Sequence, residues 1–167
     1  MSLPRHLILM RHGEAAPGGL GGDHERILTA AGQSEVRRMA LWMNGLGLNP
    51  GKLLCSSARR TQETAALVCA GLGEGGPETI VDQRLYLAEP ATLMSVLAEQ
   101  PASVRTLMVV GHNPGLDSLL RQLGRFAGAG FSTATMAVLA IASEGWKLTA
   151  SEPVQLLSLT RPDSLPD

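Results

Sequence analysis

Two histidines in this sequence come shortly after apolar segments, and an arginine precedes the first of them. His12 follows Leu7–Met10 and Arg11, and His112 comes two residues after Leu107–Val110. Apolar runs of this length are typical of strands that are covered on both faces of a parallel sheet. Because ligands bind beyond the carboxyl ends of such strands, we expect both imidazoles to lie at one edge of the same sheet, where a ligand would bind.

A second arginine follows a shorter apolar strand. Arg60 stands near the start of a predicted helix, a few residues after the strand expected at Lys52–Cys55. Guanidinium groups bind phosphate oxygens bidentately, and backbone N–H groups at a helix start add to such a site. Taken singly, each of these arginines and histidines is an ordinary surface or turn residue. Together, at the ends of three strands, Arg11, Arg60 and the two histidines predict a site for a phosphoryl group.

The chemistry that these side chains support is nucleophilic catalysis by histidine. A neutral imidazole attacks phosphorus in line, and water then removes the phosphoryl group from the ring nitrogen. Nearby arginines lower the pKa of the nucleophile, and Arg11, Arg60 and His112 would hold the negative charge of the transferred group. The sequence has no GxxxxGK[ST] phosphate loop and no metal-ligand spacing of Cys, His, Asp or Glu. We therefore expect no cofactor and no metal.

Alternating strands and helices are expected to position these residues. The pattern predicts an α/β fold: a three-layer α/β/α sandwich with a mostly parallel central sheet, helices on both faces and a C-terminal β hairpin. The hairpin strands are expected at Thr135–Ala142 and Trp146–Ala150, with a further strand at Val154–Leu159. Glycine-rich loops are expected at Glu14–Glu25 and Phe126–Ser132. After a lead-in at 1–4, the other strands are expected at 5–10, 52–55, 79–81 and 105–110, and the helices at 30–44, 59–70, 93–97 and 116–123.

Length and composition exclude several classes of protein. The 167 residues are expected to form one domain spanning 1–167. A net charge of −1 and 3% aromatic residues disfavour a nucleic-acid partner, which would need a basic face and stacking side chains. No apolar run approaches the ~20 residues of a membrane span, and the N-terminus does not resemble a signal peptide. Because Cys55 and Cys69 do not suggest a disulfide framework, we expect a cytoplasmic protein without a membrane partner.

Three motifs in this order resemble those of the histidine phosphatase superfamily, also called the phosphoglycerate mutase-like family. They are Leu9–Glu14, Ser56–Thr64 and Val110–Gly115. Within the family, nearly the whole chain is similar to the short bacterial proteins of the SixA type, which are phosphohistidine phosphatases. The resemblance implies the phosphoglycerate mutase-like fold, with His12 as the nucleophile and His112 as the second histidine of the pocket. The residues that it assigns to the phosphate are Arg11, Arg60 and His112.

The sequence departs from the family pattern at the position of the general acid. Many members have Glu in a Leu-x-Glu segment after the third strand, and Leu87 stands there in this chain. Glu89 is a candidate substitute, although a Glu before Pro90 is also a common solvent-exposed residue. Glu14 is a second candidate. A phosphohistidine substrate needs little help from an acid, because a protonated imidazole already leaves readily.

The spacing of the motifs bears on the substrate. Only 51 residues separate Arg60 from His112, which leaves no room for the large lid that family members acting as mutases or bisphosphatases generally have. An open pocket favours hydrolysis over mutase transfer, because water reaches the intermediate. The preferred function is therefore a protein phosphohistidine phosphatase, whose partner is a phosphorylated protein such as a phosphotransfer domain. The alternatives are a phosphomonoesterase acting on a small phosphorylated metabolite and a non-catalytic phospho-binding module.

Overall fold

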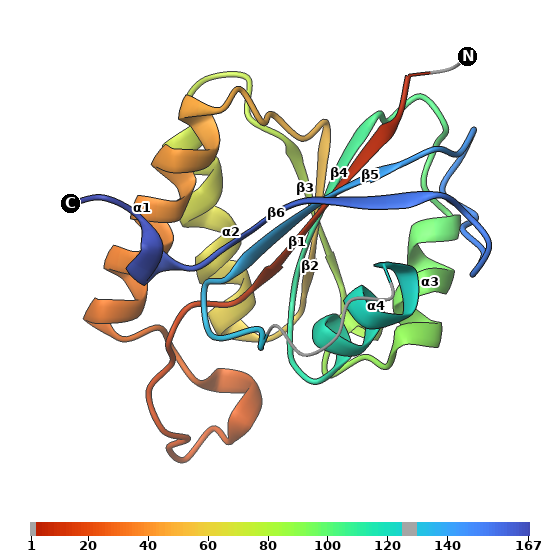
Figure 1. Cartoon of the computed structure of the whole chain (residues 1–167). Coiled ribbons are helices and arrows are strands. Elements are labelled where there is room, and N and C mark those ends of the chain that lie inside the picture. Colours follow the sequence, from red (N-terminus) through yellow and green to blue (C-terminus); the bar gives the residue numbers. More distant parts are fainter. Residues whose placement is uncertain (1–2, 125–129) are drawn as a thin grey trace.

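A six-stranded sheet forms the centre of the molecule (Figure 1). The computed structural model describes residues 3–124 and 130–167, so the lead-in expected at 1–4 and the loop expected at Phe126–Ser132 fall partly outside the described residues. The strands are β1 (Arg5–Arg11), β2 (Lys52–Ser56), β3 (Glu78–Asp82), β4 (Thr106–Gly111), β5 (Met136–Ile141) and β6 (Val154–Thr160). They lie in the order β3-β2-β4-β1-β5-β6. Pairing is parallel from β3 through β1 and antiparallel at β5 and β6, which confirms the prediction of a mostly parallel sheet.

Helices cover both faces of this sheet (Figure 1). The helices are α1 (Ala30–Gly45), α2 (Arg59–Leu72), α3 (Pro90–Ala98) and α4 (Gly115–Gly124). Buried side chains of α1 and α2 form one hydrophobic cluster with the sheet, and those of α3 and α4 form another. This arrangement confirms the predicted three-layer α/β/α sandwich. Among the residues that the structure describes, no helix is both long and apolar enough to cross a membrane.

The strand β1 runs through the middle of the molecule and is buried on both faces. Leu7 and Leu9 belong to the cluster with α3 and α4, whereas Ile8 and Met10 belong to the cluster with α1 and α2. All four side chains are 0% exposed. Successive side chains of a strand point to opposite faces, so a strand that is covered on both faces requires an uninterrupted apolar run. The change to polar residues at Arg11 therefore marks the carboxyl end of this strand.

The prediction of the second hairpin strand was wrong. Trp146–Ala150 is not a strand, and β5 instead pairs antiparallel with β6. The alternating pattern arose because Trp146 and Leu148 are buried in the cluster with α3 and α4 without pairing in the sheet. Trp146 donates its indole N–H to the carbonyl oxygen of Val104, at 2.8 Å. The further strand expected at Val154–Leu159 is confirmed and forms the edge of the sheet as β6.

Candidate active site

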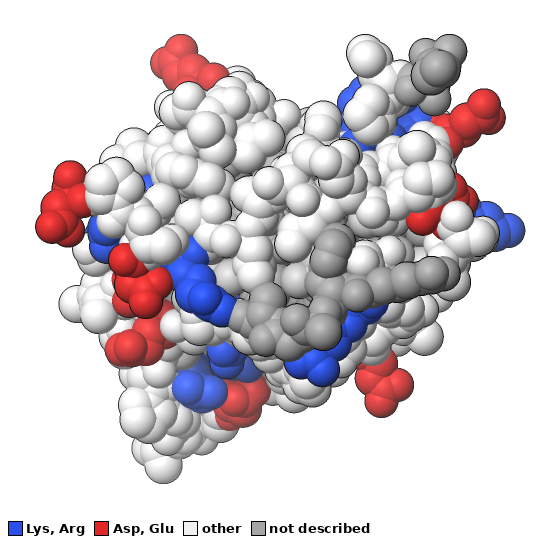
Figure 2. Space-filling view, viewed as in Figure 1, with Lys and Arg blue, Asp and Glu red and all other residues white. Residues whose placement is uncertain are grey.

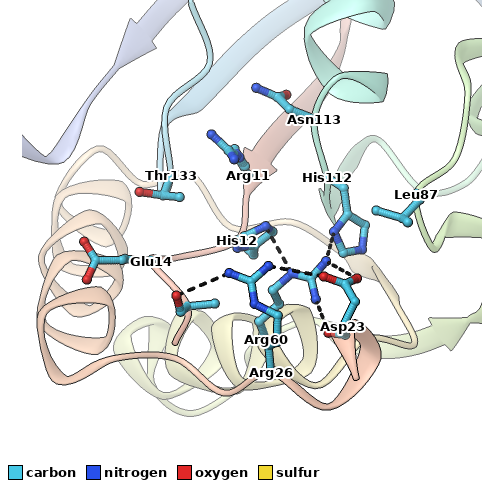
Figure 3. Close-up of a pocket in the computed structure, with 11 residues that line it drawn as sticks. Arg11, His12, Glu14, Asp23, Arg26, Arg60, Leu87, His112, Asn113 and Thr133 are labelled. Atoms are coloured by element: carbon cyan, nitrogen blue, oxygen red, sulfur yellow. Dashed lines mark hydrogen bonds and ion pairs between the residues drawn. The ribbon is translucent and has the colours of Figure 1, made fainter. Parts of the chain in front are cut away.

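Four residues that the sequence singled out line one pocket at the carboxyl ends of β1 and β4 (Figure 3). The pairing of β1 with β4 ends at Arg11 opposite Gly111, so His12 and His112 leave the sheet side by side. Their ring centroids are 5.4 Å apart. The pocket has a volume of about 400 Å³. Its lining consists of Arg11, His12, Glu14, Ala15, Asp23, Arg26, Arg60, Leu87, His112, Asn113 and Thr133.

His12 is held in one tautomer by its own loop. Its Nδ1 lies 2.7 Å from the carbonyl oxygen of Gly13, and because a carbonyl only accepts, Nδ1 carries the proton. Its Nε2 is therefore unprotonated and accepts a hydrogen bond from Nε of Arg60, at 3.3 Å. The pKa of His12 is lowered to about 4, mainly by burial and also by the charges of Arg60, Arg11 and Arg26, against the opposing effect of the Gly13 carbonyl. The ring is neutral at physiological pH, with its lone pair available in the pocket.

His112 is held in a similar way from the other strand. Its Nδ1 accepts from a terminal nitrogen of Arg60, at 3.2 Å, which places the ring proton on Nε2. That Nε2 donates to Oγ of Ser56, at 2.7 Å, and the same oxygen accepts the backbone N–H of Ala58, at 3.1 Å. Burial, and then the charge of Arg60, lower the pKa of His112 to about 3. Both histidines therefore direct an unprotonated nitrogen toward one guanidinium.

Arg60 is the guanidinium that both histidines face, and it is only 3% exposed. Besides the two imidazoles, it donates to the carbonyl oxygen of Asp23, at 2.8 Å, and to the carboxylate of the same residue, at 3.1 Å. Arg60 lies in the first turn of α2, where the helix dipole disfavours a cation, and the Asp23 carboxylate offsets this effect. Arg59, in contrast, is exposed and pairs with Glu63 on the surface. The structure thus brings Arg60, and not Arg59, into the pocket.

Arg11 adds a second guanidinium to the pocket lining. It donates to the carbonyl oxygen of Phe131, at 3.1 Å, and Asn113 donates its side-chain amide to the same oxygen, at 2.5 Å. Nε of Arg11 and Oδ1 of Asn113 are buried and have no hydrogen-bond partner among the described residues. Burial and the charge of Arg60 lower the pKa of Arg11. An unpaired buried donor is costly, and a bound anion would satisfy it.

The structure does not bring Glu89 into the pocket. Glu89 is the residue that precedes α3, and Leu87 lines the pocket instead. Glu14 does line the pocket, but its carboxylate accepts from the hydroxyl of Thr29, at 2.9 Å. Figure 3 shows this carboxylate directed away from both histidines. Neither acid suggested by the sequence is therefore placed to protonate a group that leaves from the phosphoryl site.

Asp23, which lines the pocket, and Tyr86, which contacts it, were missed as site residues by the sequence reasoning. The Asp23 carboxylate contacts Arg60 and also accepts from the hydroxyl of Tyr86, at 2.5 Å, and from Arg26, at 3.2 Å. The hydrogen bond from Tyr86 contributes most to lowering the pKa of Asp23 to about 2, with Arg26 and Arg60 adding to it and partial burial opposing it. The i,i+3 spacing of Asp23 and Arg26 was a weak signal for their ion pair. Nothing in the sequence linked Asp23 to an arginine that lies far along the chain.

The segment from Gly13 to Leu28 includes the glycine-rich loop expected at Glu14–Glu25, is attached to α2 at both of its ends, and lines one side of the pocket. Gly13 donates its N–H to the hydroxyl of Thr64, at 3.1 Å, and Leu28 donates its N–H to the carboxylate of Glu63, at 2.8 Å. A Cβ at Gly13 would lie 2.8 Å from a methyl carbon of Val36, so glycine is required by the close approach of α1. Figure 2 shows basic side chains interspersed with acidic ones in the lower part of the viewed face, where this edge of the sheet lies in Figure 1.

The low pKa values of His12 and His112 predict that stability depends on pH. In the unfolded chain both rings take up protons as the pH falls below about 6.5, whereas in the folded protein they do so only below about 4. The unfolded state binds more protons in this window, so the free energy of unfolding falls as the pH decreases from about 6.5 to about 4. Urea unfolding followed by circular dichroism at several pH values measures this slope.

A double variant tests whether His12 and His112 cause this pH dependence of the free energy of unfolding. His12→Gln combined with His112→Gln is expected to flatten the slope between pH 6.5 and 4. His6→Gln, on β1 and outside the pocket lining, is the matched control and should keep it. An unchanged slope in the double variant would show that other groups cause the acid destabilisation.

Comparison with known proteins adds to this geometry. Residues 7–86 match the model of the histidine phosphatase superfamily (branch 1). An uncharacterised protein of Mycobacterium tuberculosis is 31% identical over 144 residues, which cover 80% of this chain and 87% of that protein. A 2,3-bisphosphoglycerate-dependent phosphoglycerate mutase of Methylorubrum extorquens is 33% identical over 86 residues, or 50% of this chain and 41% of the mutase.

Solved structures agree with the sequence matches. A protein provisionally named the phosphohistidine phosphatase SixA of Nakamurella multipartitia has a TM-score of 0.82 and 26% identity, covering 96% of this chain and 98% of its own. A similarly named protein of Agrobacterium tumefaciens has a TM-score of 0.81 and 26% identity, covering 96% and 100%. The chain therefore belongs to the histidine phosphatase superfamily, and it is a SixA-like phosphatase.

Proposed function

We propose that this phosphatase hydrolyses phosphohistidine in a phosphorylated protein, by transfer of the phosphoryl group to His12. The observation on which the choice of substrate rests is the state of the two carboxylates that line the pocket. Asp23 is held ionised by three hydrogen-bond donors, and Glu14 is bonded to Thr29. A pocket without an acid in position suits a leaving group that already has its own proton, as a protonated imidazole does.

The first step transfers the phosphoryl group to the enzyme. Nε2 of His12 forms a bond to phosphorus while the bond from phosphorus to the substrate ring nitrogen breaks, and its electron pair returns to that nitrogen. The proton stays on Nδ1 of His12, which donates it in a hydrogen bond to the Gly13 carbonyl oxygen and so fixes the ring for attack. Arg11 and Arg60 bind the equatorial oxygens, whose charge is greatest in the transition state. His112, whose ring N–H donates to Ser56, accepts from Arg60 and holds that guanidinium in place.

The second step hydrolyses the phosphorylated enzyme. A bond forms between the oxygen of water and phosphorus while the Nε2–phosphorus bond breaks, and the electron pair returns to Nε2 of His12. Both water protons stay with the product, which leaves as dihydrogen phosphate. His12 is thus restored as the neutral tautomer that the structure shows, with Nδ1 still bonded to Gly13.

The connection between α2 and β4 supports a protein substrate. It contains only β3, a short 3-10 helix at Gln83–Leu85 and α3, so there is no large inserted lid over the described pocket. A phosphohistidine on the surface of a phosphotransfer domain therefore has access to His12. We propose such a domain as the partner and, because domains of this kind work in the cytoplasm, we place the activity there.

A comparison of substrates tests the proposed function. The wild-type chain is given a phosphotransfer protein labelled on histidine, an aryl phosphate and a panel of small phosphorylated metabolites. We expect loss of phosphohistidine with a kcat/KM at least about tenfold above that for any other substrate, which corresponds to about 1.4 kcal/mol of preferential transition-state binding. Turnover of small substrates alone would indicate a phosphomonoesterase, and phosphate binding without turnover would indicate a binding module.

A further inference from the structure

We propose that Asp23 selects phosphohistidine by accepting a hydrogen bond from the far ring nitrogen of the departing imidazole. This inference rests on the proposed function and assigns to this residue a contact with the substrate. A carboxylate beside the arginine that is expected to hold the phosphate repels a doubly charged phosphomonoester. The same carboxylate attracts a leaving group that is cationic, and the protonated ring of a phosphohistidine is such a group.

Asp23 is fixed in place by donors from three parts of the chain. Arg60 comes from α2, Tyr86 from the segment before α3, and Arg26 from the same loop as Asp23 itself. The carboxylate side chain is nevertheless 46% exposed. Arg60 and Tyr86 both donate to Oδ2, whereas Oδ1 accepts only from Arg26 among the described residues. Oδ1 therefore keeps a free lone pair at the pocket surface for one further donor.

The position of Asp23 suits a group that leaves on the side opposite His12. Figure 3 shows His12 and the Asp23 carboxylate on opposite sides of the Arg60 guanidinium. A phosphoryl oxygen that accepts a hydrogen bond from Arg60 lies close to Asp23, because the Arg60 guanidinium is 3.1 Å from the Asp23 carboxylate. The far nitrogen of a phosphohistidine lies one ring width beyond the nitrogen that is bonded to phosphorus. A substrate ring whose phosphoryl group is bound to Arg60 is therefore within reach of the Asp23 carboxylate, and we place the departing ring there.

The rings next to Asp23 offer a surface for a planar leaving group. Tyr86 stacks edge-on against His24 and against His112, with centroid distances of 4.9 and 5.5 Å. His24 is fixed by a 2.9 Å hydrogen bond between its Nε2 and the hydroxyl of Ser57. Aromatic groups favour edge-to-face and offset contacts with a further ring. A departing imidazole would thus pack beside Tyr86 while its N–H donates to Asp23.

In the proposed step, Asp23 does for the substrate ring what the Gly13 carbonyl does for His12. As Nε2 of His12 bonds to phosphorus, the electron pair of the breaking bond returns to the substrate nitrogen that carried the phosphoryl group. The proton stays on the far nitrogen, which donates a hydrogen bond to Asp23, so the product ring leaves as neutral imidazole. Both rings therefore keep one N–H on a fixed acceptor throughout, and no proton is transferred.

The test compares two substrates in the full-length Asp23→Asn variant. Against a phosphohistidine-labelled phosphotransfer protein, we expect kcat/KM to fall by roughly 10- to 100-fold, because the acceptor loses its charge. Against p-nitrophenyl phosphate, whose leaving group needs no proton, kcat/KM should stay within about fivefold or rise, because an amide oxygen still accepts from Arg60 and the backbone carbonyl of the same residue holds this guanidinium as before. The alkaline limb of the phosphohistidine pH profile should also move down by about one unit, since the carboxylate no longer favours the protonated ring.

Two controls separate a contact with the substrate from a structural effect. Glu25→Gln removes a neighbouring charge from the same turn without touching the pocket lining and should leave both rates unchanged. Competitive inhibition by inorganic phosphate should persist in Asp23→Asn, which shows that Arg60 remains in place. An equal loss on both substrates would overturn the role of Asp23 alone. A wild-type chain that hydrolyses p-nitrophenyl phosphate but not phosphohistidine would overturn the proposed function and this inference with it.

Discussion

Replacing His12 by alanine is expected to abolish the phosphatase activity, with kcat/KM at least about 10⁴-fold below wild type. The ring cannot be replaced by water, because its Nε2 is the one group that would form the bond to phosphorus. The remaining pocket would still bind phosphate through Arg11 and Arg60, so the loss should appear in kcat. Steady-state kinetics with a phosphohistidine-labelled protein and with an aryl phosphate measure this effect.

Chemical trapping distinguishes His12 from His112 as the nucleophile. The two rings are held alike, each with one N–H on an oxygen acceptor and one lone pair toward Arg60. We propose His12 because the motif around Arg11 resembles the family motif that carries the nucleophile. Quenching the wild-type enzyme with labelled substrate should give acid-labile label on the peptide containing His12, and the His12→Ala variant should give none.

The matched control for this substitution is another histidine of the same strand. His6→Ala, also on β1, removes an imidazole that does not line the pocket and should retain wild-type kcat. Inhibition by inorganic phosphate should remain in His12→Ala, which shows that the pocket is intact. Label on the peptide containing His112, or turnover by His12→Ala within tenfold of wild type, would contradict the assignment.

The convergence of the four pocket residues could be predicted because it follows from the sheet. Arg11 and His12 end one buried strand, His112 follows its parallel neighbour, and register then places the ends of both strands together. Arg60 could be separated from Arg59 only by the resemblance to the family, and burial in the structure agrees with that choice. Predictions of this kind succeed where the backbone alone determines which side chains meet.

Other features depended on contacts that a sequence pattern does not encode. Trp146 and Leu148 are both buried, as alternate residues of a strand would be, although this segment does not pair in the sheet. Glu89 is close in sequence to Leu87, but the chain turns at Leu87, where φ is 49°, and only Leu87 lines the pocket. Asp23 comes from a loop whose path is set by its hydrogen bonds to α2. Loop paths follow from such tertiary contacts, which no local pattern reveals.

Arg60→Lys is expected to reduce kcat/KM by about 10³-fold, although the positive charge is kept. Arg60 donates simultaneously to His12, to His112 and to both the backbone and the carboxylate of Asp23. A lysine has three donors on a single nitrogen, so it cannot span these four acceptors and also donate to a phosphoryl oxygen, as the fifth N–H of the guanidinium can. The loss should therefore fall on transition-state binding and appear on phosphohistidine and aryl phosphate alike, unlike the effect of Asp23→Asn.

The neighbouring residue provides the control, because Arg59 has the same side chain on the same helical turn but faces solvent. Arg59→Lys removes only a surface contact with Glu63 and should leave kcat/KM within about twofold of wild type. A neutral variant, Arg60→Met, separates charge from geometry. The charge of Arg60 contributes to the low pKa of both His12 and His112, so its removal raises both pKa values and moves the acid limb of the residual activity to higher pH. If Arg60→Met keeps the wild-type acid limb, burial alone sets the protonation state of the histidines. If Arg60→Lys keeps wild-type activity, the planar array of guanidinium donors is not what stabilises the transferred phosphoryl group.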